Sequence, residues 1–218
     1  MNGNRAVACG LLACVLAGGV IWWASSSVES PAVDDGPPIP VRPDSEEPYR
    51  PYDYQFTPEQ NIQLLEERVK ADPGDHLSLT LLGGLYLRKA KNDGNHALYD
   101  NAGAAFAKAL KALPTHEDAQ VGMALFHGSK HRFAEGLALA SAVYKEAPDR
   151  LDALVVASDS LLELGRYEEA EAALKELEAK ASAPPPPSLI ARRARLKELH
   201  GDPESALKLL ATAEEAQR

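Results

Sequence analysis

The sequence predicts an all-α protein whose helices pair and stack into a solenoid, and three observations support this prediction. Pro114 and Pro148 lie 34 residues apart, and each ends an apolar run with helical spacing. Each unit of this period holds a pair of such runs, which is typical of helical solenoids. The composition, with 25% charged and 45% hydrophobic residues, is that of a globular protein.

Residues 1–24 are predicted to be a transmembrane signal anchor. Residues 6–24 carry no charge, and nineteen helical residues reach about 28 Å, the thickness of a bilayer's hydrocarbon core. Two tryptophans near the end of this stretch favour the membrane–water interface. Arg5 precedes the span, and the next basic residue is Arg42. We therefore expect a single-pass protein of a bacterial inner membrane, with a cytoplasmic N-terminus and a periplasmic or extracellular domain.

Two alternatives for this segment remain open. A cleaved signal peptide would yield a secreted protein, although its apolar stretch is normally only about 7–15 residues long. A lipoprotein would be modified at Cys14, but the apolar run continues for ten residues beyond that cysteine. Both cysteines of the chain lie inside the span, so the exported part has no thiol for a disulfide, a cysteine zinc site or a nucleophile.

Residues 25–57 are predicted to be a disordered, acidic linker. They contain seven prolines and seven acidic residues but only two basic ones. Such a segment cannot bury enough apolar surface to fold, and its prolines extend it. It would separate the anchor from a folded domain that spans residues 58–218.

The folded domain is predicted to begin with a helix over residues 58–71. Thr57 and Gln60 have the spacing of a capping box, and Pro58 occupies the first helical position. We interpret this helix as a half-repeat that covers the apolar end of the stack.

The first helix pair is predicted over residues 76–114. Small and apolar side chains recur there at helical spacing: Leu79, Leu82, Gly83 and Tyr86 on the first helix, Ala102, Phe106 and Ala109 on the second, and the closing Pro114. This pattern resembles the tetratricopeptide repeat at all of its signature positions. The unit is seven residues longer than the repeat pattern requires, and seven residues make about two helical turns. One added turn in each helix would preserve the packing phase and leave residues 91–96 as a protruding turn.

Three further pairs are predicted over residues 117–148, 151–182 and 187–218. Their repeat positions include Ala124, Gly136 and Pro148 in the first, Gly165, Tyr167, Ala170 and Leu174 in the second, and Ala194, Ala206 and Leu210 in the third. Gly165 is an expected helix stop. In the last pair, Arg193 and Lys197 occupy positions that are usually apolar, so we expect its first helix to be rotated or loosely packed.

No motif for catalysis or for cofactor binding stands out, so we expect neither an enzyme nor a bound cofactor or small-molecule substrate. His127 and His131 are the only histidines at ligand spacing, but they straddle a predicted turn and lack a third ligand for a metal. Residues 58–218 hold 20 basic and 25 acidic side chains, which is the opposite of a nucleic-acid-binding balance. One basic cluster is either a solvated helix face, which we prefer, or a site for an anionic ligand. It consists of Arg192, Arg193, Arg195 and Lys197.

The resemblance to tetratricopeptide repeats implies a right-handed superhelix in which the first helix of each pair lines a concave, peptide-binding groove. By position, the groove would be lined by Leu77, Thr80, Gly84, Leu87, Arg88, Asp118, Val121, Leu125, Asp152, Val155, Asp159 and Leu162. Because these residues are more apolar than charged, we expect an extended or helical peptide with apolar anchors.

The sequence thus favours a non-enzymatic, membrane-tethered scaffold or adaptor that binds a peptide or protein partner in this groove. An alternative function follows from a second resemblance. An anchor, a spacer and an exported repeat domain are similar to the tetratricopeptide subunit of bacterial cytochrome c maturation, which implies a chaperone that holds apocytochrome. If the N-terminal segment is cleaved or lipidated, the same domain would be secreted or lipid-anchored instead.

Overall fold

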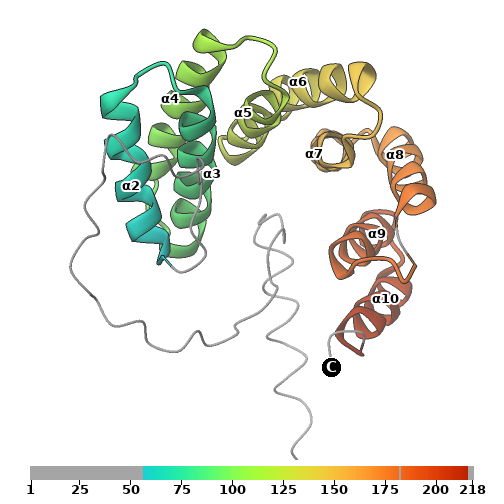
Figure 1. Ribbon diagram of the computed structural model, residues 1–218. Helices are drawn as coiled ribbons and strands as arrows, with labels where there is room; N and C mark the ends of the chain where they lie inside the picture. The colour runs from blue at the N-terminus through green and yellow to red at the C-terminus, as the bar shows by residue number, and fades with distance from the viewer. Residues whose placement is uncertain (1–55, 182, 216–218) are drawn as a thin grey trace, which may run out of the picture. The chain divides into compact units, whose positions relative to one another are not determined.

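The computed structural model describes residues 56–181 and 183–215, and their regular secondary structure is entirely α-helical (Figure 1). Within these residues there are nine helices: α2 (Pro58–Ala71), α3 (His76–Asp93), α4 (Ala97–Ala112), α5 (Glu117–Ser129), α6 (Phe133–Glu146), α7 (Leu151–Glu163), α8 (Tyr167–Lys180), α9 (Pro187–Leu199) and α10 (Pro203–Glu215). The prediction of an all-α fold made of helix pairs is confirmed. The predicted anchor, residues 1–24, and residues 25–55 of the predicted linker lie outside the described residues. Among the helices that are described, none is both long and apolar enough to cross a bilayer.

Helix α2 begins at a capping box. The backbone N–H of Gln60 donates to Oγ1 of Thr57 at 3.2 Å, and the backbone N–H of Thr57 donates to Oε1 of Gln60 at 2.8 Å. Pro58 at the first helical position gives up no hydrogen bond, because the N–H groups there have no partner inside the helix. The buried Asn61 adds hydrogen bonds from Nδ2 to the carbonyl oxygens of Phe56 and Thr57 at 3.2 Å. This local chemistry sets the start of the helical array.

The seven additional residues of the first pair lengthen both of its helices. Helix α3 has 18 residues and α4 has 16, whereas helices α5 to α10 have 13 or 14. Helix α3 ends at Gly94, which adopts the left-handed conformation with φ of 66°. The turn is shorter than the predicted residues 91–96, because α3 continues through Asp93 and only residues 94–96 separate it from α4. A glycine is suited to this C-cap, since it has no Cβ to oppose positive φ.

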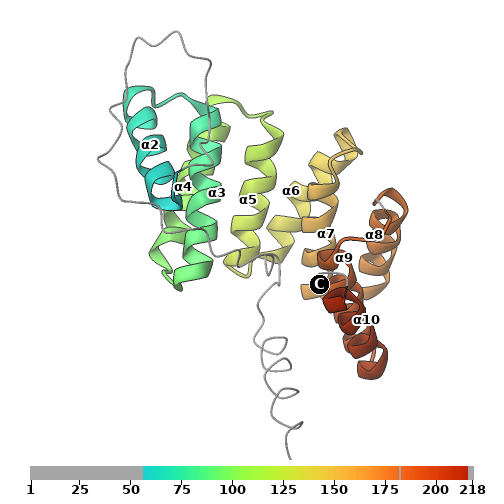
Figure 2. The same ribbon diagram turned by 60° about the horizontal axis from the view of Figure 1, so that its bottom comes forward.

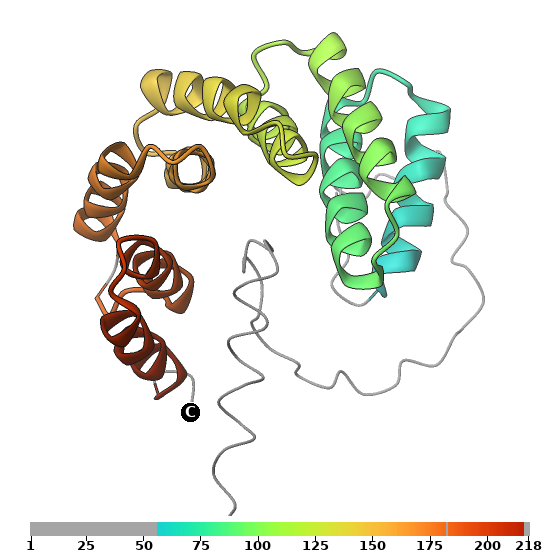
Figure 3. The same cartoon turned by 180° about the vertical axis from the view of Figure 1, so that it is seen from behind.

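The chain divides into two compact units at Arg166, which places α2–α7 in one unit and α8–α10 in the other. In the larger unit each helix contacts the next along the chain, and the first helices α3, α5 and α7 also contact one another in that order (Figure 2). The partner helix α4 lies behind α3 in Figure 1 and in front of it when the protein is seen from behind (Figure 3). The first helices of this unit therefore form one contiguous row, and each of the partner helices α4 and α6 packs against the first helices before and after it in the chain.

Phe106 is the centre of the first core cluster in the larger unit. It is 2% exposed and packs with Leu65, Leu82, Leu85, Tyr86 and Ala102. Two glycines make room for its ring: a Cβ on Gly83 of α3 would lie 2.7 Å from Cε1 of Phe106, and one on Gly122 of α5 would lie 2.2 Å from the same atom. Gly103 provides similar room for Phe126. The aromatic rings therefore bring α3, α4 and α5 into close contact.

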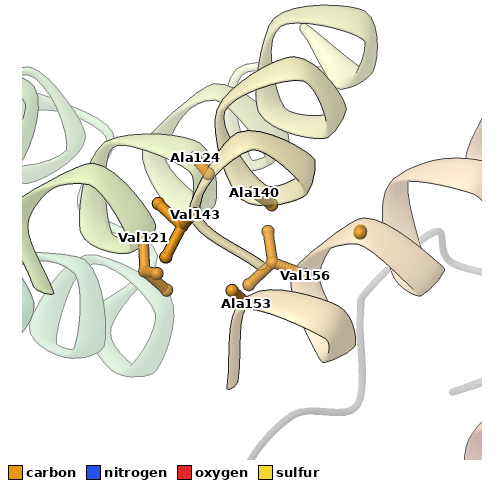
Figure 4. Close-up of a cluster of buried hydrophobic side chains, with 7 residues drawn as sticks. Val121, Ala124, Ala140, Val143, Ala153 and Val156 are labelled. Carbon is orange, nitrogen blue, oxygen red and sulfur yellow. The ribbon is translucent and has the colours of Figure 1, made fainter. Parts of the chain in front are cut away.

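A second core cluster joins α5, α6 and α7. Its buried members converge from the three helices (Figure 4), and they are Val121, Ala124, Ala140, Val143, Ala153, Val156 and Ala157. Gly136 of α6 permits a close approach to α5, because a Cβ there would lie 3.0 Å from the carbonyl oxygen of Ala124. The alanines and this glycine allow the helices to pack at short distance.

In the smaller unit, α9 packs against both α8 and α10. The α8 residues Ala170 and Leu174 are fully buried. Arg193 of α9 forms ion pairs with Glu178 and Glu171 of α8. The expectation that α9 is rotated or loosely packed stays a prediction. The imidazole of His200 lies edge-on to the ring of Tyr167, with their centroids 5.6 Å apart.

Candidate functional site

The residues predicted to line a groove lie on α3, α5 and α7 of the larger unit. We refer to the surface that these residues form as the first-helix face. Leu77, Gly84, Arg88 and Asp118 are exposed, and Thr80, Leu87, Leu125, Asp152, Val155 and Asp159 are half-buried. Leu77 is 43% exposed, which is high for a leucine. Leu77, Leu87, Leu125 and Val155 supply the accessible apolar part of this face.

Two of the predicted residues do not offer contact surface. Val121 is 5% exposed because it belongs to the core cluster that joins α5, α6 and α7. Leu162 is buried as well. A position in a repeat indicates which side of a helix a residue occupies, but neighbouring helices decide how much of its side chain stays accessible.

Arg150 organises the polar end of the first-helix face. This residue occupies the N-cap position of α7, and its guanidinium contacts carboxylates from two helices. Nη1 lies 3.0 Å from Oε2 of Glu117, and Nη2 lies 2.7 Å from both Oδ1 of Asp118 and Oδ2 of Asp152. Nε donates a further bond of 3.0 Å to Oδ1 of Asp152, which makes the Arg150–Asp152 contact bidentate. The N-terminal turns of α5 and α7 are thereby linked.

The contact between Arg150 and Asp152 shifts the pKa values of both groups. Hydrogen bonds from Arg150 lower the pKa of Asp152, although partial burial opposes this effect. The same hydrogen bonds raise the pKa of Arg150 above its already high value. Two of the predicted groove acids, Asp118 and Asp152, thus share one guanidinium.

Two histidines lie beside this network. The rings of His76 and His116 meet edge to face, with centroids 4.9 Å apart. Nε2 of His116 is buried and has no hydrogen-bond partner among the described residues. Burial is the largest cause of the lowered pKa of His116. The two rings thus bring the start of α3 and the residue before α5 into contact.

Sequence reasoning missed Arg150, Glu117 and the two histidines. A usable signal was present, because His116 and Arg150 are 34 residues apart and each immediately precedes a first helix. Asp118 and Asp152 are also separated by one period. A basic residue next to a repeated acidic position indicates an ion pair across neighbouring repeats, although only the structure shows that Arg150 reaches both acids.

Arg150→Ala should lower the free energy of unfolding by about 1–2 kcal/mol, because three neighbouring carboxylates would lose their shared cation. The measurement is urea denaturation of the full chain in detergent micelles, followed by circular dichroism. The loss should shrink at high salt, which screens the remaining repulsion. Arg195→Ala is the control, since Arg195 forms a single pair with Glu198 within one helix. A cost no larger than that of the control would contradict a linking role for Arg150.

The remaining candidates from the sequence do not form a polar site. His127 lies in α5, whereas His131 lies in the following turn with φ of 57°, and the described residues contain no group of three potential metal ligands. The basic cluster on α9 is dispersed: Arg192 is buried, Arg193 pairs with α8, and Arg195 pairs with Glu198. These contacts favour the interpretation of the cluster as part of helix packing and surface ion pairing over an anion site.

The chain is similar to one sequence family and to several proteins of known structure. The sequence family described as anaphase-promoting complex, cyclosome, subunit 3 matches residues 95–177. A tetratricopeptide repeat protein from Parabacteroides merdae is similar with a TM-score of 0.60 and 18% identity over 72% of this chain, which spans only 58% of that protein's length. MamA from Desulfovibrio magneticus RS-1 is similar with a TM-score of 0.56 and 19% identity, over 72% of this chain and 84% of its own. No curated protein matches the sequence. At such low identity, these similarities establish the fold alone.

Proposed function

We propose that this chain, which has the fold of tetratricopeptide-repeat proteins, is a non-enzymatic, membrane-tethered adaptor that binds a polypeptide partner at the first-helix face. The observation that carries this proposal is the accessible apolar set of Leu77, Leu87, Leu125 and Val155 on one face of three adjacent helices. Stacked repeats bury one side of each helix against neighbouring repeats and leave the inner row of helices available to a guest.

The chemistry of the face supports a polypeptide rather than a small molecule. Apolar side chains lie on all three helices and carboxylates lie on α5 and α7, so contacts are spread over the length of the row rather than gathered at one point. A peptide segment can satisfy such a surface, because it carries several apolar anchors and polar groups along one chain.

The tether would serve to raise the local concentration of the domain. In this proposal residues 1–24 span the inner membrane, and residues 25–57 connect the span to a domain on the periplasmic or extracellular side. A linker of this length has a root-mean-square reach of roughly 30 Å. Confinement within that distance lets a face of modest affinity capture partners that lie near the membrane.

Photocrosslinking in intact membranes tests the proposal. A photoreactive amino acid at Leu125 and one at Val155 should capture the same partner, because both side chains are accessible on the same face. The double substitution Leu125→Glu with Val155→Glu should reduce capture of the partner by about tenfold or more, since it places charge where apolar anchors bind. Capture by this variant is measured with a photoreactive amino acid at Leu87.

Leu113 provides the matched control, because it is an exposed leucine that follows α4 and lies outside the first-helix face. Leu113→Glu should leave capture unchanged. Unchanged capture in the folded double variant would show that another surface binds the partner. A chain without residues 1–24 should capture less, and equal capture would argue against the tether.

A further inference from the structure

The helical glycines of the larger unit fall into two groups. At Gly83, Gly103, Gly122 and Gly136, an added Cβ would lie within 3.0 Å of another residue, so close packing explains why a side chain is absent. At Gly84 and Gly128, an added Cβ would meet nothing within 4 Å. Glycine is a poor helix former compared with alanine, so these two positions weaken their helices without improving the packing of the described residues.

Gly84 belongs to the first-helix face, and Gly128 lies beside Leu125 of that face. Gly84 is seven residues after Leu77 and four before Arg88 on α3, and these spacings place all three residues on one side of the helix. Gly128 follows Leu125 by three residues on the neighbouring helix α5. At these two positions a guest can approach the helix backbone without meeting a side chain.

The charge of the face indicates which guest would be attracted. Glu117, Asp118 and Asp152 surround a single guanidinium, and each of the three carboxylates is at least 43% exposed. The exposed Glu163 adds a carboxylate near the end of α7, and Asp159 adds a half-buried one on the same helix. The exposed Arg88 and Lys91 on α3 are further cations on this side of the described helices, so the carboxylates outnumber the cations and are concentrated on α5 and α7. An excess of accessible carboxylates attracts basic groups and repels acidic ones.

We propose, on the basis of the function proposed above, that the first-helix face binds a cationic polypeptide segment whose main chain crosses α3 at Gly84 and α5 at Gly128. The apolar side chains of the segment pack on Leu77, Leu125 and Val155. Its lysine or arginine side chains pair with the carboxylates around Arg150. Charge complementarity selects the partner, and the two glycines determine where its backbone passes.

Two labelled peptides test the charge of the partner. Both carry leucines at the same positions of a chain of about 15 residues, a length that spans adjacent helices when extended. The other positions hold lysine and glutamine in the first peptide, and glutamate and glutamine in the second peptide. Binding to the full chain in nanodiscs of zwitterionic lipid is measured by fluorescence anisotropy, with empty nanodiscs as the blank.

The lysine peptide should bind about tenfold more tightly than the glutamate peptide at low salt, and its affinity should fall as salt is added. Equal binding, tighter binding of the glutamate peptide, or no binding of the lysine peptide would overturn the inferred charge. If crosslinking at Leu125 still captures a partner in membranes, only this inference fails and the adaptor function stands.

Leucine substitutions test the path of the main chain. Gly84→Leu and Gly128→Leu should each raise the Kd of the lysine peptide by about tenfold, which corresponds to the loss of one close contact. Neither should lower the melting temperature, because the added side chain points into open space. Ala107→Leu on α4 is the control, because it adds a leucine at an exposed helical position away from the face and should leave the Kd unchanged. An unchanged Kd in both glycine variants would overturn the proposed path.

Discussion

Replacing Phe106 with alanine is expected to lower the free energy of unfolding by about 3–5 kcal/mol. The ring is almost completely buried and contacts helices on both sides of α4, so its removal leaves a cavity between Gly83 and Gly122. Neither glycine has a side chain that could fill this cavity. The loss should be seen in urea denaturation of the full chain in detergent micelles.

Phe133→Ala is the control for this experiment. Phe133 is only half-buried at the first position of α6, so less apolar surface is lost when its ring is removed. We expect a clearly smaller cost than for Phe106→Ala. Equal costs would contradict the central position of Phe106 in the core.

Gly122→Ala should destabilise the protein by about 1–3 kcal/mol, although alanine is the better helix former. The reason is steric, because the new Cβ would lie 2.2 Å from Cε1 of Phe106, and the buried ring has little space into which to move. The change should shift the urea midpoint downward and leave the helical signal of the folded state intact.

Gly84→Ala is the matched control, because it adds the same methyl group to a helical glycine whose surroundings are open. It should be neutral or stabilise the helix by up to about 1 kcal/mol, so the two substitutions should have opposite signs. Phe106→Leu should reduce the cost of Gly122→Ala, since the pair is coupled through direct contact. Independent, additive effects of the two changes would argue against this contact.

Much of the fold could be predicted from the sequence because its signals are local. The capping box of Thr57 and Gln60, the glycine stops at Gly94 and Gly165, and the prolines between pairs each act within a few residues. The apolar spacing then predicts which side of each helix is buried. The lengthened first pair was also predictable, because seven residues are close to two helical turns.

The candidate site was less predictable, because its properties depend on residues that are distant in the sequence. Repeat position placed Val121 and Leu125 on the same side of α5, yet Val121 is buried by side chains from α6 and α7 while Leu125 stays partly accessible. Arg150 follows a proline turn without any distinctive motif, and its role arises from two acids that lie more than 30 residues earlier in the chain.

The sequence by itself determined that the described chain is a series of paired helices, and it determined where most of them begin and end. Hydrogen bonding at helix ends and the period of apolar residues act over short distances, so they can be recognised without a structure. The tertiary structure decided which helical glycines receive a neighbouring ring and which remain open, as Gly83 and Gly84 show at adjacent positions. It also decided how the charges of the first-helix face are shared. Both outcomes depend on which surfaces meet when helices pack, and that is a property of the assembled fold.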